Sequence, residues 1–241
     1  MAYAKLRPTK NADGSAVVTP SRTGSYGEAY ALPVGTGRMM MADEGSYYVA
    51  TNATIGTQLT GHVAPAIAET NTKSIIHFLN PATATKDVYL DYLVITTVVA
   101  NASATAVDFL AWTDQKGSTG LSSGGTAIAS ISNVRADSTN TSGITLTAGA
   151  CVTAPATNIH KVLQRTVKPY IGVALDSYSF LFGNGAFVPT GFALITAVTH
   201  TLTSCAPIVV GPGCNFYFVQ TGPSGAATAM TFEFEMGYWE R

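Results

Sequence analysis

The sequence predicts an all-β protein: an antiparallel β-sandwich of the jelly-roll kind, with an irregular, extended N-terminal arm and at most one short helix. Short runs rich in Val, Ile, Tyr, Phe and Thr recur from residue 74 to the end of the 241-residue chain. Turns containing Gly, Pro and Asn separate these runs at intervals of roughly 8 to 15 residues. No period of about 20 to 50 residues repeats, which argues against a solenoid or a propeller.

Residues 1–70 are expected to form the extended arm, and residues 71–241 the sandwich with its core. The arm contains Pro8, Pro20 and Pro33 and many glycines, and it shows neither strand nor helix periodicity. It is also rich in tyrosine and methionine, which are costly to expose unless they dock on another surface. We therefore expect it to contact other subunits, while an arm wrapped over its own domain is the alternative. The residues expected at subunit contacts are Tyr26, Tyr30, Met39, Met40, Met41, Tyr47, Tyr48 and, at the other end of the chain, Trp239.

Four strands are predicted in the first half of the domain, because their β-branched and aromatic residues suit a pleated, half-buried surface. Turn-forming residues such as Asn80-Pro81 separate them. Two polar segments, 116–125 and 136–149, are expected to be loops. The four predicted strands are Ser74–Leu79, Asp87–Val99, Ala106–Trp112 and Thr126–Val134.

One short helix is predicted between residues 158 and 168. Its apolar and threonine side chains recur at the i, i+3, i+4, i+7 and i+8 spacing of one helix face. Thr157 or Asn158 would cap this helix, and Pro169 would end it. The residues of the predicted apolar face are Ile159, Val162, Leu163, Thr166 and Val167.

The clearest strand is the last one, Thr231–Trp239. Phe232, Phe234, Met236 and Tyr238 alternate in it with polar or small residues, so one side of the strand is expected to pack on a core. The other side would meet solvent or a neighbouring subunit. Further strands are predicted at Ile171–Leu175, Tyr178–Phe182, Phe192–Thr203, Pro207–Val210 and Asn215–Gln220.

The composition limits the classes of function. Only 11% of the residues are charged and the net charge is −1, whereas about 25% charged residues is typical of globular domains. The mean hydropathy is +0.23, yet no apolar stretch reaches the roughly 20 residues of a spanning helix. We therefore expect neither nucleic acid nor membrane as a partner, and a surface largely covered by other chains. The alternative is that Thr-, Ala- and Gly-rich β proteins simply carry few charges.

The N-terminal residues and the cysteines favour synthesis in a cytoplasm. The first eight residues contain no apolar core of signal-peptide length. Cys151, Cys205 and Cys214 are an odd number without paired short spacing, and they are expected to stay reduced.

We expect no catalytic residue, no cofactor and no metal site. The four histidines are scattered without metal-ligand spacing. Ser122 lies in a Gly-x-Ser-x-Gly match, but in a predicted loop instead of the strand-to-helix turn that a nucleophile elbow needs. Glu233 and Glu235 share one side of the last strand, as a glycosidase pair would, although a polar outer face is the simpler interpretation. Asp87 and Asp91 are likewise interpreted as part of a polar face.

Several segments resemble virion structural proteins of tailed bacteriophages. Residues 42–52 and 56–65 look like the opening of such proteins, and residues 121–128 and 232–241 are similar to jelly-roll capsid decoration, or cement, proteins. The resemblance extends over most of residues 40–241. It implies a non-enzymatic protein that binds the outside of an icosahedral phage head, often as a homotrimer, and stabilises it by subunit packing. The implied partners are the major capsid protein and sister subunits, and the implied location is the virion.

The main alternative is a tail-associated or receptor-binding phage protein that binds a host surface glycan. Trp112 and Trp239 would suit this role because flat aromatic rings stack on sugars, although burial is the simpler role for Trp239. A glycosidase or esterase, and a tail-tube or adaptor protein, are two further alternatives.

Overall fold

The structure is a computed structural model in which two units are distinguished, residues 1–36 and residues 37–241. All described residues belong to the second unit. Tyr26, Tyr30 and most of the predicted strand 192–203 lie outside them. The described residues are 37–52, 54, 56–62, 71–99, 107–114, 120–168, 174–183, 200–221 and 229–241.

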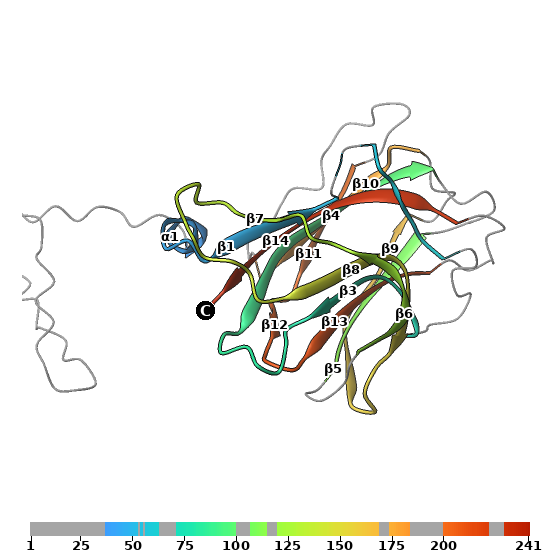
Figure 1. Cartoon of the computed structure of the whole chain (residues 1–241). Helices are drawn as coiled ribbons and strands as arrows, with labels where there is room; N and C mark the ends of the chain where they lie inside the picture. Colours follow the sequence, from blue (N-terminus) through green and yellow to red (C-terminus); the bar gives the residue numbers. More distant parts are fainter. Residues whose placement is uncertain are drawn as a thin grey trace, which may run out of the picture. The chain divides into compact units, whose positions relative to one another are not determined.

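The described residues form one short helix and fourteen strands, arranged in two sheets that pack face to face (Figure 1). The elements are α1 Gly37–Asp43, β1 Tyr47–Thr51, β2 Leu59–Thr60, β3 Lys73–Leu79, β4 Val88–Val99, β5 Val107–Asp114, β6 Gly120–Ala127, β7 Ile131–Asn133, β8 Thr145–Ala154, β9 Ile159–Lys168, β10 Ser177–Phe182, β11 His200–Cys205, β12 Ile208–Val210, β13 Asn215–Thr221 and β14 Thr231–Glu240.

Eight of these strands have the connectivity of a jelly roll, as predicted. In the first sheet the order is β11-β10-β4-β14-β1-β7, and in the second it is β6-β8-β3-β13-β5-β9. The inner strands of the two sheets are β1-β14-β4-β10 and β3-β13-β5-β9. Along the chain these eight strands alternate between the sheets except at β5 and β9, which both lie in the second sheet, as in a jelly roll. Strands β6, β7 and β8 are inserted between β5 and β9. They extend both sheets, β7 beside β1 and β8 with β6 beside β3.

One strand pair departs from the antiparallel rule. Strands β10 and β11 pair in parallel, whereas the other pairs of the described residues are antiparallel. A parallel pair needs a crossover of a dozen or more residues. Residues 183–199 separate these two strands and supply that length.

The core between the sheets is aromatic and confirms the predicted inward side of the last strand. Phe232, Phe234, Met236 and Tyr238 are at most 5% exposed. From the opposite sheet, Phe109 and Phe218 meet Phe180 of β10, with ring centroids 5.0 to 5.2 Å apart. Each such side chain contributes about 1.5 to 3 kcal/mol through its removal from water.

Residues 37–62 include strands of the sandwich, so a boundary between arm and domain at residue 70 is wrong. Strand β1 pairs with β14 on one side and with β7 on the other. Tyr48 and Ala50 of β1 are fully buried in the core. The strand was not recognised in the sequence because it has only five residues, too few for a periodic pattern.

The predicted helix at residues 158–168 is also wrong, because this segment is β9, which pairs antiparallel with β5. Its β-branched residues suit a strand. A register shift opposite Ala111 and Trp112 places an extra residue, Val162, beside the buried Leu163. This bulge interrupts the period of two, and the apolar spacing then resembles that of a helix.

The two predicted loops are partly strands. Residues 120–127 form β6, whose Ser and Gly side chains are mostly exposed while its backbone pairs with β8. Residues 145–149 begin β8. Neither segment shows the side-chain alternation that identifies a strand in a sequence. β6 is a strand nonetheless, because its main chain pairs with a neighbouring strand.

Candidate functional site: the outer face of the first sheet

The outward side of the first sheet carries a row of large side chains that is only partly covered. Tyr47 of β1, Trp239 of β14, Tyr89 of β4 and Val209 of β12 are successive cross-strand partners. We call these four residues the aromatic row. Val209 is 48% exposed, Trp239 and Tyr89 are half-buried, and Tyr47 is buried. The exposed part of the row is therefore a band of apolar surface over β14, β4 and β12, which the buried Tyr47 of β1 flanks.

The rings of the aromatic row stack on one another. Trp239 lies 6.3 Å from Tyr47 and 5.6 Å from Tyr89, measured between ring centroids, with interplanar angles of 22° and 2°. The two tyrosines come from strands on opposite sides of β14, so they flank the indole. Its flat faces are thus occupied by the chain's own side chains, which disfavours stacking of a sugar on Trp239.

A bulge and a glycine hold the aromatic row in this arrangement. The pairing of β14 with β4 shifts register between Gly237 and Tyr238, which leaves Asp91 as the extra residue of β4. The hydroxyl of Tyr47 donates a hydrogen bond of 2.6 Å to the Asp91 carboxylate. A Cβ at Gly237 would lie 2.6 Å from that hydroxyl and 2.2 Å from a ring carbon of Tyr92. Only glycine leaves room for both tyrosines at this position.

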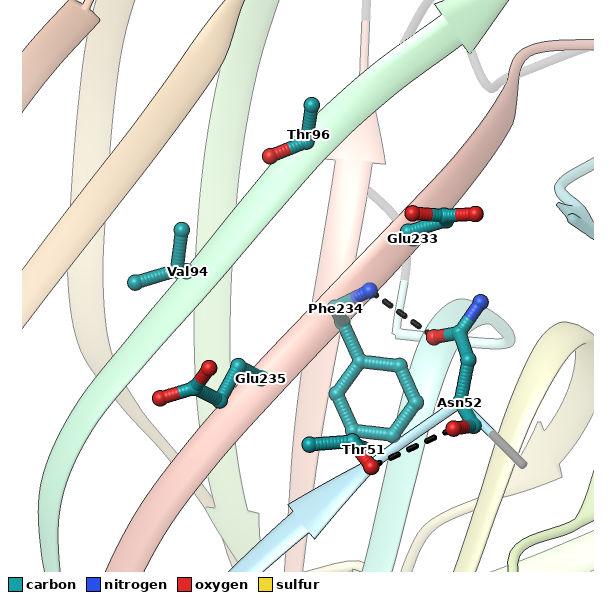
Figure 2. A pocket seen from close by; sticks show the side chains of 7 residues that line it. All are labelled: Thr51, Asn52, Val94, Thr96, Glu233, Phe234 and Glu235. Atoms are coloured by element: carbon teal, nitrogen blue, oxygen red, sulfur yellow. Dashed lines mark hydrogen bonds between the residues drawn. The ribbon is translucent and has the colours of Figure 1, made fainter. Parts of the chain in front are cut away.

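Beside the aromatic row the same face becomes acidic. A pocket of about 350 Å³ opens over β1, β4 and β14, and Figure 2 shows Glu233 and Glu235 on the same strand at its edge. We call it the acidic pocket. Its lining residues are Thr51, Asn52, Val94, Thr96, Glu233, Phe234 and Glu235.

Backbone and tyrosine groups position the two carboxylates of the acidic pocket. The amide of Gly56 donates to Glu233 over 2.8 Å, and the hydroxyl of Tyr92 donates to Glu235. Asn52 accepts a 2.9 Å hydrogen bond from the backbone amide of Phe234, which ties the end of β1 to β14 (Figure 2). Neither carboxylate forms an ion pair with a Lys or Arg of the described residues. The pocket therefore suits a cationic or hydroxyl-rich group.

The predicted subunit-contact residues do not form one surface. Met40 is 41% exposed on α1, and Trp239 belongs to the aromatic row. Met41 is buried beside the hydroxyl of Ser46, and Tyr48 stacks on Tyr238 with ring centroids 5.7 Å apart. The prediction is wrong for Tyr48 and Met41, because the chain's own core covers them. The side chain of Met39 lies outside the described residues, and Tyr47 supports the aromatic row from a buried position.

Three residues of this face were missed in the sequence. Tyr89 and Tyr92 belong to a recognised strand, but their side of the sheet depends on the bulge at Asp91. Val209 is near Tyr89 only through the pairing of β12 with β4. Asp91, interpreted as part of a polar face, is 2% exposed and hydrogen-bonded. No local sequence pattern shows that these residues are neighbours on one face, because cross-strand neighbours are set by strand register.

A second polar cluster is buried in the other sheet. His77 Nε2 lies 3.0 Å from Asn215 Oδ1, and Asn215 donates from its amide group to Asp114 over 2.8 Å. The hydroxyl of Tyr217 and the backbone amide of Ala156 also donate to Asp114, over 2.5 and 3.1 Å. Burial lowers the pKa of His77 from 6.5, against the opposing effects of Asn215 and Asp114. This cluster holds β3, β5 and β13 together.

The remaining candidate groups are dispersed. Ser122 is exposed on β6, away from any strand-to-helix turn. Cys151 is buried, and burial raises the pKa of its thiol to about 12. Within the described ranges no group of three or more His, Cys, Asp or Glu side chains is arranged to hold a metal ion. No helix in the described part of the chain has the length and apolarity needed to cross a bilayer.

No protein-family model, curated protein or solved structure matches this chain.

Proposed function

We propose that this chain is a non-enzymatic structural protein of a tailed-bacteriophage virion, a capsid decoration or cement protein that stabilises the head by packing against capsid protein and sister subunits. The observation that carries the proposal is the aromatic row on an open sheet face. Trp239 and Tyr89 are half-buried and Val209 is 48% exposed on neighbouring strands. Contiguous apolar surface of this kind is typical of protein–protein contacts.

The composition and the fold support the same proposal. Only 11% of the residues are charged, and aromatic side chains are enriched at interface cores while Lys, Glu and Asp are depleted there. The jelly roll is an architecture that viral capsid domains use. The resemblance of residues 42–52, 56–65, 121–128 and 232–241 to phage virion proteins points to a shell of this kind.

The mechanism is cohesive. Apolar area buried between subunits contributes roughly 25 cal/mol per Å² before the costs of association are subtracted. Repetition of one contact over a shell then gives avidity that a single contact lacks. In this proposal the outer face of the first sheet makes the stabilising contacts, and the protein catalyses no reaction.

The test is to locate the chain in purified phage particles. Antibody labelling and electron microscopy should place it on the outside of the head, and particles lacking it should break at lower temperature or after milder osmotic shock. Particles that never contain the chain contradict the proposal.

The acidic pocket favours a second candidate, a tail-associated or receptor-binding protein that holds a host glycan. Two carboxylates, the amide of Asn52 and two threonine hydroxyls are the kind of groups that bind sugar hydroxyls. Labelling at the tail, together with saturable binding on a glycan array that Asn52→Ala abolishes, would favour this candidate over the first.

A further inference from the structure

The main chain of β6 lies directly on the polar cluster that is buried in the second sheet. A Cβ at Gly120 would lie 2.5 Å from Nε2 of His77 and 2.2 Å from Oδ1 of Asn215, the two atoms of one hydrogen bond. A Cβ at Gly125 would lie 2.6 Å from Sγ of Cys151. Only glycine permits so close an approach at these two positions. β6 therefore covers His77 and Cys151, which are at most 1% exposed.

β6 is held less firmly than the strands beneath it. It is an edge strand, and among the described strands it pairs with β8 alone (Figure 1). Two register shifts interrupt that pairing, one after Leu121 and one after Gly124. Residues 122–127 are exposed, so they bury little apolar area. A strand with few buried contacts and an interrupted ladder opens locally at a lower free energy than the whole domain.

The hydrogen bonds of the cluster determine which nitrogen of His77 would take up a proton. Asn215 donates from its side-chain amide to Asp114 over 2.8 Å, which leaves its Oδ1 facing His77. Nε2 of His77 therefore carries the hydrogen of the neutral ring, and Nδ1 has the lone pair. Nδ1 is buried and has no hydrogen-bond partner among the described residues. A proton on Nδ1 would create a buried charged donor without an acceptor there, which is unfavourable.

The groups that surround His77 do not offset this cost. Asn215 of β13 and Asp114 of β5 favour the charged ring, but burial outweighs both and lowers the pKa of His77 from 6.5. Tyr217 of β13, with its ring centroid 5.4 Å away, is neutral because its hydroxyl donates to Asp114. On β8, burial raises the pKa of the Cys151 thiol to about 12, so this thiol is neutral too. β6 contains no titratable residue.

We propose that β6 is a pH-sensitive strap, which stays closed over the cluster while His77 is neutral and opens when His77 takes up a proton. Water solvates the charged ring in the open state, whereas the closed state binds the proton more weakly. Opening is then favoured by up to about tenfold for each unit that the pH falls below 6.5, until the pKa of the closed state is reached. The two sheets stay folded. The strap belongs to the isolated chain, so it goes beyond the proposed function and does not depend on it.

Cys151 can report the opening of the strap, because its thiol lies under Gly125. The chain has three cysteines, so Cys205→Ser with Cys214→Ser leaves Cys151 as the single thiol of the full-length protein. Its rate of reaction with a dipyridyl disulfide is measured as the pH is lowered. Division by the rate for the same protein unfolded in urea cancels the pH dependence of the reagent. We expect this labelling ratio to rise below pH 6.5, by up to about tenfold per unit.

Two histidine variants identify the group that takes up the proton. His77→Gln still offers an amide donor to Asn215 but does not titrate, so its labelling ratio should stay constant as the pH falls. His62→Gln is the matched control, because Nε2 of His62 lies 3.1 and 3.0 Å from the backbone oxygens of Ser74 and Cys151. This variant should keep the wild-type rise. A rise that is lost in His62→Gln and kept in His77→Gln would assign the effect to His62 and overturn the proposal.

A glycine variant tests the cover itself. Gly125→Ala would place a methyl group 2.6 Å from Sγ of Cys151 and from a methyl carbon of Thr147, so it should raise the labelling ratio at every pH. Gly56→Ala is its control. Gly56 also has a positive φ, 85° against 71°, but nothing lies within 4 Å of its Cβ. Equal ratios in the two variants would show that β6 does not cover Cys151.

Hydrogen exchange shows whether the opening is local. Relative to their intrinsic exchange rates, the amides of residues 120–127 should lose protection below pH 6.5, while those of β13 and β14 keep theirs. A labilised β13 and β14 at the same pH would overturn the strap, because His77 would then trigger unfolding of the whole domain. A wild-type labilling ratio that does not change with pH would overturn it as well. None of these outcomes bears on where the chain lies in phage particles, so the proposed function is tested separately.

Discussion

Gly237 determines how closely the side chains of the outer face pack. The methyl group of an alanine there would collide with the Tyr92 ring and with the Tyr47 hydroxyl. We predict that Gly237→Ala lowers stability by about 1 to 3 kcal/mol, because both tyrosines must move and the hydrogen bond from Tyr47 to Asp91 is lost. Thermal unfolding measures this loss. Gly143→Ala is the control, since nothing lies within 4 Å of its Cβ, and an equal loss there would contradict the steric argument.

His77 gives the fold a dependence on pH. Its pKa in the folded chain lies below the ordinary value of 6.5 because burial disfavours the charged ring. The unfolded chain therefore binds a proton more readily in the interval below pH 6.5, and stability falls as pH drops from 6.5 toward the folded pKa. We predict that urea unfolding shows this decrease in wild type and a smaller one in His77→Gln. An unchanged slope in the variant would assign the pH dependence to other groups.

Asp114 joins three strands through its carboxylate. Removal of the side chain leaves donors of Asn215, Tyr217 and Ala156 without their acceptor inside the protein. We predict that Asp114→Ala lowers the free energy of unfolding by about 3 kcal/mol or more, since buried donors to a charged acceptor lose their partner. Chemical denaturation measures the change. Asp137→Ala, at an exposed ion pair, should change the free energy of unfolding far less in the same assay.

At the scale of elements, β1 is the strand that links the N-terminal part of the chain to the core. It is paired on both sides and buries Tyr48 and Ala50. We predict that a chain beginning at Gly37 keeps its β-sheet circular dichroism and unfolds cooperatively. A chain beginning at Asn71 should lose cooperative unfolding, because β14 then exposes the edge and the core surface that β1 covers. Cooperative unfolding of the shorter chain would show that β1 is dispensable.

For the whole molecule, the expected state is an oligomer. The aromatic row and the low charge leave apolar surface that another chain would cover. We predict that light scattering gives a mass of about three times the 25.0 kDa of one chain. Ser122→Ala should leave this mass unchanged, because Ser122 lies on an exposed strand remote from a nucleophile turn. A mass of one chain at micromolar concentration would contradict the prediction.

The fold class could be predicted because its signals are local. In β14, Phe232, Phe234, Met236 and Tyr238 alternate with polar or small residues, and this period of two is visible without any partner strand. The β-branched run of β4 and the alternation in β14 predicted the strands that form the middle of the first sheet. In β9 the bulge interrupts this alternation, and the sequence pattern therefore suggested a helix. The segment is a strand because it pairs with β5.

The candidate site could not be predicted in the same way, because its residues meet only through strand register. Tyr47, Tyr89, Val209 and Trp239 are far apart along the chain and become neighbours in the pairing of β1, β14, β4 and β12. The amphipathic pattern of β14 and the small number of charged residues can be read directly from the sequence. The tertiary structure decided which side of each strand faces outward, since a one-residue bulge at Asp91 moves the side chains that follow to the opposite side.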